Sequence, residues 1–160
     1  LPNCDVSTAP ALLALTNSDP NFFRPMMGLH PTYVKEDVAE QLAWLETELN
    51  RRSDYVAVGE IGLDFYWDMT FAGQQRDALR EQLGCAAERG LFVSLHTRSG
   101  HGCDAFAETA DIIEKLALPG LTGIFHCFTG TLADAERAIA LGFKLGIGGV
   151  ATFKNGGLDK

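Results

Sequence analysis

Short apolar runs alternate with longer amphipathic segments along the whole chain, and this alternation most restricts the possible folds. The longer segments repeat their apolar residues at helical spacing, as Val38, Leu42, Leu45 and Leu49 do. Strands that are apolar along their whole length are buried on both faces, which is typical of a parallel sheet. The pattern therefore predicts an α/β fold in which helices connect parallel strands.

The expected elements follow one another without a linker, an internal repeat or a low-complexity tract. After a first strand that ends near Asn3, strands are expected at 25–30, 55–59, 91–95, 122–128 and 143–147. Helices are expected at 7–15, 36–49, 71–89, 104–118 and 132–141. A doubly wound open sheet and a (β/α)8 barrel both satisfy this order. Residues 1–160 are expected to form a single domain.

Composition excludes several classes of protein. Of the 160 residues, 46% are hydrophobic, enough for a sizeable core and too many for a disordered chain. No window approaches 18 consecutive apolar residues, and the first residues lack the pattern of a secretory signal, so no membrane association is expected. The net charge of −8 excludes a protein that holds nucleic acid by bulk positive charge.

Cysteine and glycine spacing exclude two further kinds of site. The four cysteines are widely separated with no CxxC pair, which argues against a zinc ribbon or a thioredoxin-like motif and favours a reduced state in the cytoplasm. The GIGG run at 146–149 lacks the surrounding pattern of a phosphate loop, so no nucleotide cofactor is expected. The oligomeric state has no signal in the sequence.

Functional groups collect at the carboxyl ends of the expected strands or a few residues later. They are His30, Glu60, Asp64, His96, Arg98 and His126. In a parallel α/β fold these ends share one rim, where ligands bind. A single histidine there is more often a structural residue, but two imidazoles and a carboxylate on one rim form a three-ligand set with open positions. Glu60, His96 and His126 are therefore predicted to hold a catalytic metal.

Three neighbouring features have two interpretations each. Gly59 and Gly62 predict a tight strand exit where the backbone approaches a ligand closely. Arg98 is suited to bidentate binding of phosphate or carboxylate, or to a salt bridge with an acid such as Asp64. The aromatic run at 65–67 is expected to pack on the following helix, with stacking on a nucleobase as the alternative.

At these residues the sequence resembles the TatD family of metal-dependent deoxyribonucleases. The matching stretches, in family order, are GLHP (28–31), VGEIGLDFYWD (58–68), SLHTR (94–98), IFHCFTGT (124–131) and KLGIGGVATFKN (144–155). The resemblance implies a (β/α)8 barrel of the TIM type with two divalent metal ions, Mg, Mn or Zn. It also implies hydrolysis of phosphodiester bonds in DNA, bound through phosphate and metal.

The resemblance also implies roles for individual residues. Glu60 resembles the catalytic carboxylate that bridges the two metals, and His96 and His126 resemble the histidines of the second metal. The remaining three, His30, Asp64 and Arg98, resemble active-site or phosphate-side residues and are expected to bind substrate.

Two family motifs have no counterpart here: the opening HxH of the first strand and the late motif whose Asp binds the first metal. The chain is therefore expected to correspond to strands 2–7 of an incomplete barrel and to require the absent segments for activity. Two alternatives stay open: an amidohydrolase-type enzyme that cleaves a C–N or ester bond, and an inactive metal-binding remnant.

Overall fold

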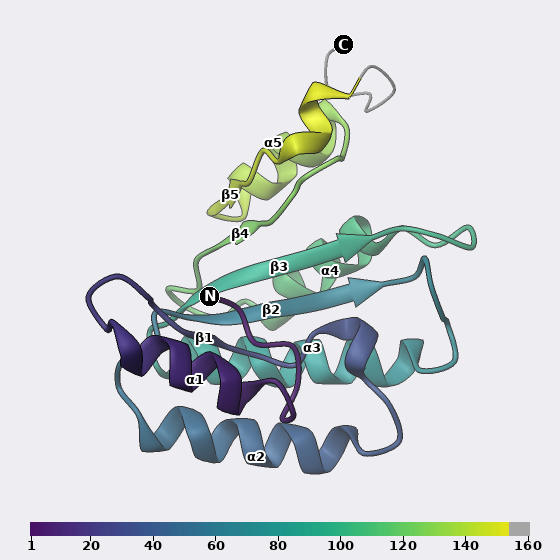
Figure 1. Ribbon diagram of the computed structural model, residues 1–160. Coiled ribbons are helices and arrows are strands. Elements are labelled where there is room, and N and C mark those ends of the chain that lie inside the picture. The colour runs from purple at the N-terminus through teal and green to yellow at the C-terminus, as the bar shows by residue number, and fades with distance from the viewer. Residues whose placement is uncertain (154–160) are drawn as a thin grey trace.

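A computed structural model of the chain describes residues 1–153, so the final two residues of the 144–155 stretch, Lys154 and Asn155, lie outside the described part. Five parallel strands form one sheet (Figure 1). They are β1 (Met26–Met27), β2 (Ala57–Asp64), β3 (Phe92–Arg98), β4 (Gly123–Phe125) and β5 (Phe143–Leu145). Each strand pairs with the next one in the chain. This order is that of a (β/α)8 barrel and rules out a doubly wound sheet, whose strand order reverses.

The first residues of the chain extend the sheet beyond β1. The Asn3 N–H donates to the carbonyl of Met26 at 3.1 Å, and the Met26 N–H donates to the carbonyl of Leu1 at 2.8 Å. These two bonds have the pattern of parallel strands, because Met26 bonds to both Leu1 and Asn3, which are two residues apart on the neighbouring segment. The segment therefore lies where a strand ending near Asn3 was expected.

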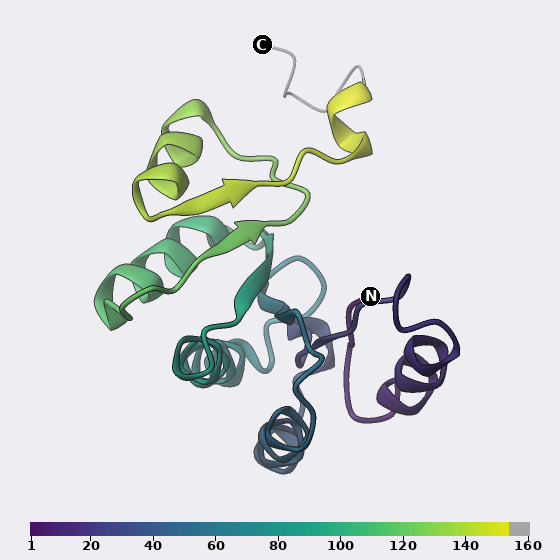
Figure 2. The same cartoon turned by 90° about the vertical axis from the view of Figure 1, so that its left-hand side faces the viewer.

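Helices follow the strands in the predicted alternation and lie on the outer side of the curved sheet (Figure 2). They are α1 (Ala9–Ser18), α2 (Val38–Arg51), α3 (Ala72–Glu88), α4 (Ala105–Leu116) and α5 (Leu132–Ala140), with short 3-10 turns η1 (Pro31–Tyr33) and η2 (Gly149–Thr152). Side-chain caps explain where two of them begin. Asp104 caps α4, and Thr131 and Asp134 form a capping box at α5.

The core lies between the sheet and this outer layer of helices. Leu79, Leu83 and Ala86 of α3 are completely buried, as are Val58 and Leu95 in the sheet below. These three α3 residues recur at helical spacing, so burying them against β2 and β3 sets the orientation of the helix. No helix within the described residues is long and apolar enough to cross a membrane.

The predicted bounds of the second long strand were wrong. β2 continues past Gly59 to Asp64, and the two glycines lie inside the strand rather than at its exit. A Cβ at Gly59 would lie 2.7 Å from the Cβ of Ser94, and one at Gly62 would lie 1.9 Å from the carbonyl oxygen of His96. The glycines therefore permit close approach of β2 to β3, not to a ligand.

Candidate metal centre

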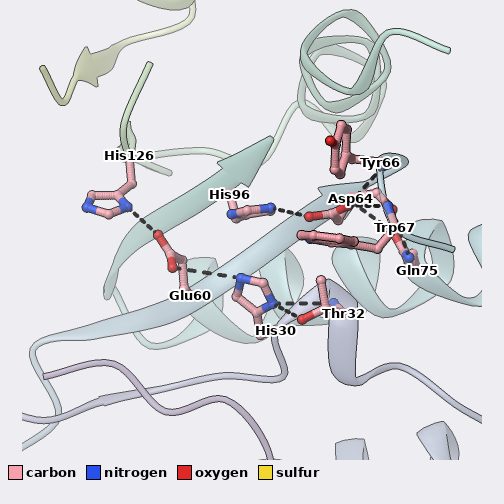
Figure 3. A network of polar contacts seen from close by, with 9 residues as sticks. All are labelled: His30, Thr32, Glu60, Asp64, Tyr66, Trp67, Gln75, His96 and His126. Atoms are coloured by element: carbon pink, nitrogen blue, oxygen red, sulfur yellow. Dashed lines mark hydrogen bonds and ion pairs between the residues drawn. The ribbon is translucent and has the colours of Figure 1, made fainter. Parts of the chain in front are cut away.

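The strand ends bring the predicted site residues to one rim (Figure 3). His30 follows β1, Glu60 and Asp64 belong to β2, His96 belongs to β3, and His126 follows β4. Each of these strands, or the turn that follows it, thus contributes one or two side chains to the site. The network in Figure 3 runs from His126 through Glu60 to His30, with the His96–Asp64 pair beside it.

A bulge in β2 determines where Glu60 points. Val58 pairs with Val93 and Ile61 pairs with Leu95, so three steps along β2 match two steps along β3. The extra residue interrupts the strict alternation of side chains between the two faces and redirects the side chain at the bulge. Glu60 is the only residue of β2 that is not fully buried, with 17% of its side chain exposed.

The carboxylate of Glu60 lies between two imidazoles. Its Oε1 is 2.5 Å from Nδ1 of His126, and its Oε2 is 3.9 Å from Nε2 of His30. The first contact lacks hydrogen-bond geometry, so Oε1 is a buried oxygen with no hydrogen-bond partner among residues 1–153. A buried carboxylate oxygen without a donor is destabilising unless a cation approaches it. The donor set therefore fits a divalent metal ion.

Three side chains are close enough to share one metal ion. His30, Glu60 and His96 each offer a ligand atom within 4.8 Å of the others, and the rings of His30 and His96 are 4.5 Å apart between centroids. His126, which is 54% exposed, contacts the other oxygen of Glu60. The structure thus groups His30, Glu60 and His96, whereas His126, the third residue of the expected set, contacts Glu60 but does not join that group.

Hydrogen bonding distinguishes His30 from His96. The backbone N–H of Thr32 donates to Nδ1 of His30 at 3.3 Å, and the Thr32 hydroxyl lies 2.8 Å from the same atom. A nitrogen that accepts carries no proton, so the proton of the neutral His30 ring is on Nε2. His30 therefore presents a donor to the rim, which suits an anionic oxygen better than a metal ion.

Burial keeps that ring neutral. It lowers the pKa of His30 from 6.5 to about 4, chiefly by desolvation and secondarily through His96, whereas Asp64 acts in the opposite direction. At neutral pH His30 is consequently an uncharged hydrogen-bond donor.

Asp64 orients His96. Its Oδ2 lies 2.8 Å from Nε2 of His96, and only 2% of the side chain is exposed. A buried carboxylate holds the proton of its histidine on the nitrogen that it faces, which leaves Nδ1 of His96 free to bind a metal. Asp64 was predicted as an active-site or phosphate-side residue that binds substrate; the structure places its carboxylate against Nε2 of His96.

Two buried glutamines that the sequence analysis missed hold the site segments on α3. The Oε1 of Gln82 accepts from the Leu29 N–H at 2.7 Å, and its Nε2 donates to the Leu29 carbonyl at 3.3 Å. Gln75 forms the same pair of bonds with the backbone of Asp64. The sequence did contain a signal for them. Gln75 and Gln82 are seven positions apart on the apolar face of α3, where buried polar side chains need hydrogen-bond partners.

Arg98 lies exposed at the end of β3 and is held by aromatic rings. Its guanidinium carbon is 4.0 Å from the centroid of Tyr66 and 5.2 Å from that of Trp67. Within residues 1–153 it forms no ion pair, so the alternative of a salt bridge with Asp64 was wrong. The expected packing of the aromatic run holds for Phe65, which is completely buried, but not for the exposed Tyr66 and Trp67.

Comparison with known proteins gives consistent results. The family model described as "TatD related DNase" matches residues 1–159. The chain is 34% identical over 135 residues to the uncharacterized metal-dependent hydrolase YabD of Bacillus subtilis. The aligned region covers 84% of this chain and 51% of that protein. The chain is also 36% identical over 146 residues to the 3'-5' ssDNA/RNA exonuclease TatD of Pantoea vagans, covering 91% of this chain and 54% of the relative.

A solved structure extends the comparison to the fold. The crystal structure of YjjV, a TatD homolog from Escherichia coli, superposes with a TM-score of 0.85 at 33% sequence identity. The superposition covers 96% of this chain and 57% of that one. The chain spans about half the length of the curated relatives that it matches.

Proposed function

Because the chain belongs to the TatD-related DNase family, we propose that its rim is the metal centre of a phosphodiesterase that hydrolyses DNA. The carboxylate of Glu60 lies between two imidazoles, and its buried Oε1 has no hydrogen-bond partner among the described residues; this is the observation that carries the proposal. Imidazole with carboxylate suits Mn or Zn, and Mg also binds such sites together with a phosphate.

Three residues would hold the metal, and the others would bind phosphate. Glu60, His96 through Nδ1, and His126 are the proposed ligands, with Glu60 as the catalytic carboxylate between two ions in a complete family site. A divalent cation bound there lowers the pKa of water and offsets the charge that develops on the phosphate.

His30 and Arg98 supply donors from two sides of the rim. His30 donates from Nε2, and the Arg98 guanidinium is suited to two oxygens of one phosphate. An arginine with no carboxylate partner among the described residues favours a phosphodiester over the C–N or ester bond of an amidohydrolase substrate.

Replacing Glu60 by Gln tests the proposal. The amide keeps the shape of the side chain but removes its charge. Mutating a residue that only hydrogen-bonds to a metal ligand typically lowers metal affinity roughly 10–100-fold. Because Glu60 is itself a proposed ligand, we expect the affinity for Mn²⁺ to fall by more than about 100-fold. Isothermal titration with Mn²⁺ measures binding. Gel analysis of 5′-labelled single-stranded DNA, with Mg²⁺, Mn²⁺, Zn²⁺ or EDTA and with the absent family segments supplied, measures hydrolysis.

The matched control is Glu46→Gln, since Glu46 is half exposed on α2 far from the rim. It should bind metal and cleave DNA as the unchanged chain does. Hydrolysis that persists in EDTA or in Glu60→Gln would contradict the proposal. Tight metal binding with no hydrolysis of DNA, even when the absent segments are supplied, would instead identify an inactive metal-binding chain.

A further inference from the structure

A cavity opens beside the candidate metal centre. Its volume is about 250 Å³, and it lies between η1 and the start of α3, with apolar walls formed by Pro31, Val34, Trp67 and Phe71. This volume lies below the roughly 300–1,000 Å³ of pockets that hold drug-sized ligands, so it suits a single flat ring system.

An exposed but anchored indole forms one wall of the cavity. Trp67 is 67% exposed, although its backbone N–H points to Oδ1 of Asp64 at 3.4 Å and its ring meets Tyr66 edge to face at 4.9 Å. The guanidinium of Arg98 lies against both rings, nearer to Tyr66 than to Trp67. A large aromatic surface that is held in place and left open to solvent is typical of a stacking platform for a planar ligand.

The cavity shares residues with the site network. Asp64, which orients His96, and Thr32, which bonds to His30, both line it, and Figure 3 shows the Trp67 ring beside Asp64. A molecule in the cavity therefore contacts Asp64 and Thr32, the same side chains that bond to His96 and His30 at the rim.

Charge determines which part of a nucleotide fits. Three acidic residues, Glu36, Asp64 and Asp68, line the cavity together with the exposed residue Lys35. Their negative charge opposes the entry of a phosphate, whereas an uncharged ring meets no such barrier. Lys35 remains available to a phosphate outside the cavity.

We propose that this cavity is a nucleobase subsite. Resting on the function proposed above, the base next to the scissile phosphate enters the cavity and stacks on Trp67. Every nucleobase has a π face, so the subsite requires a base but does not select its identity.

The chain's two tryptophans allow a direct test. Trp44→Phe leaves Trp67 as the sole indole, and its fluorescence should be quenched on titration with deoxyadenosine 5′-monophosphate in Mg²⁺. The apparent Kd should be at least about 10-fold tighter than for 2-deoxyribose 5-phosphate, since base stacking contributes about that factor. No quenching, or equal quenching by both compounds, would overturn the subsite.

The reciprocal variant is the control. Trp67→Phe keeps Trp44, which lies on α2 and not in the cavity lining, and its fluorescence should not respond to the nucleotide. An equal response in this variant would place binding elsewhere and overturn the subsite.

Hydrolysis separates this inference from the proposed function. Trp67→Ala should raise the KM for single-stranded DNA about 10-fold and change kcat much less, because the ring binds the base and not the reacting phosphate. DNA cleavage with an unchanged KM in Trp67→Ala refutes the subsite alone. Base-dependent quenching, in a chain that cleaves no phosphodiester even with the absent segments supplied, supports the subsite and refutes only the nuclease function.

Discussion

The buried carboxylate of Asp64 connects the two parts of the proposed site. Its Oδ2 bonds to His96 at the metal centre, and its Oδ1 accepts from the backbone N–H of Tyr66 at 3.0 Å in the aromatic loop. Because both oxygens are engaged and the residue is buried, a change at Asp64 alters the orientation of neighbouring groups rather than a contact with substrate. We therefore treat it as a positioning residue.

Asp64→Asn tests this role. If the amide directs its NH₂ group toward Nε2 of His96, that nitrogen must accept, and the ring proton moves to Nδ1, the atom proposed to bind metal. We expect Mn²⁺ affinity to fall about 10–100-fold with little loss of folding stability, as titration calorimetry and urea unfolding would measure. Asp77→Asn on the exposed face of α3 is the control. Unchanged metal affinity in Asp64→Asn would refute the positioning role.

At the scale of elements, the pairing of β2 with β3 sets the geometry of the site. The bulge at Glu60 and the close approach at Gly62 both lie on this pair, which carries four of the six proposed site residues, Glu60, Asp64, His96 and Arg98. Gly62 has a φ of +145°, a conformation that side-chain-bearing residues rarely adopt. The sheet can form at this position only with glycine.

Gly62→Ala should therefore disrupt the pair. Its Cβ would overlap the carbonyl of His96, and we expect a loss of more than about 4 kcal/mol in the free energy of unfolding. Gly84→Ala is the matched control because its Cβ, inside α3, meets nothing within 4 Å. It should stabilise the chain by about 0.5–1 kcal/mol. Urea unfolding followed by circular dichroism measures both, and equal stability of Gly62→Ala and the unchanged chain would contradict this assignment.

At the scale of the whole molecule, an acidic chain presents few cations to a nucleic acid. The net charge is −8, and the cationic side chains placed at the proposed site and its cavity are Arg98 and Lys35. Long-range attraction to a phosphate backbone is thus absent, and binding depends on local contacts and the metal ion.

The salt dependence of DNA binding checks this expectation. Each phosphate contact on a single strand contributes a slope of about −0.7 to a plot of log K against log salt, so two contacts predict about −1.4. Fluorescence anisotropy of a labelled oligonucleotide at fixed Mg²⁺, between about 50 and 200 mM salt, gives the slope. Arg98→Ala should bring it closer to zero by about 0.7. A slope steeper than about −3 would contradict binding through these two cations.

Periodicity made most of the fold predictable. The helices α2, α3 and α5 begin and end within about two residues of the expected bounds, because amphipathic spacing and terminal glycines act locally. The strands were harder: β1 has two residues where six were expected, and β2 continues five residues beyond its expected end. Strand length depends on hydrogen bonds to a neighbouring strand, and no local pattern records where those bonds stop.

The sequence by itself determined that this is a parallel α/β chain with imidazole, carboxylate and guanidinium groups at the ends of its strands, because burial and periodicity are properties of neighbouring residues. Only the tertiary structure decided which groups meet. Three features depend on contacts between segments about 30 or more residues apart. They are the bulge that turns Glu60 toward His126, the carboxylate that sets the tautomer of His96, and the wall of the cavity beside them. Register between such segments is fixed by packing of the whole sheet, which no single stretch of sequence encodes.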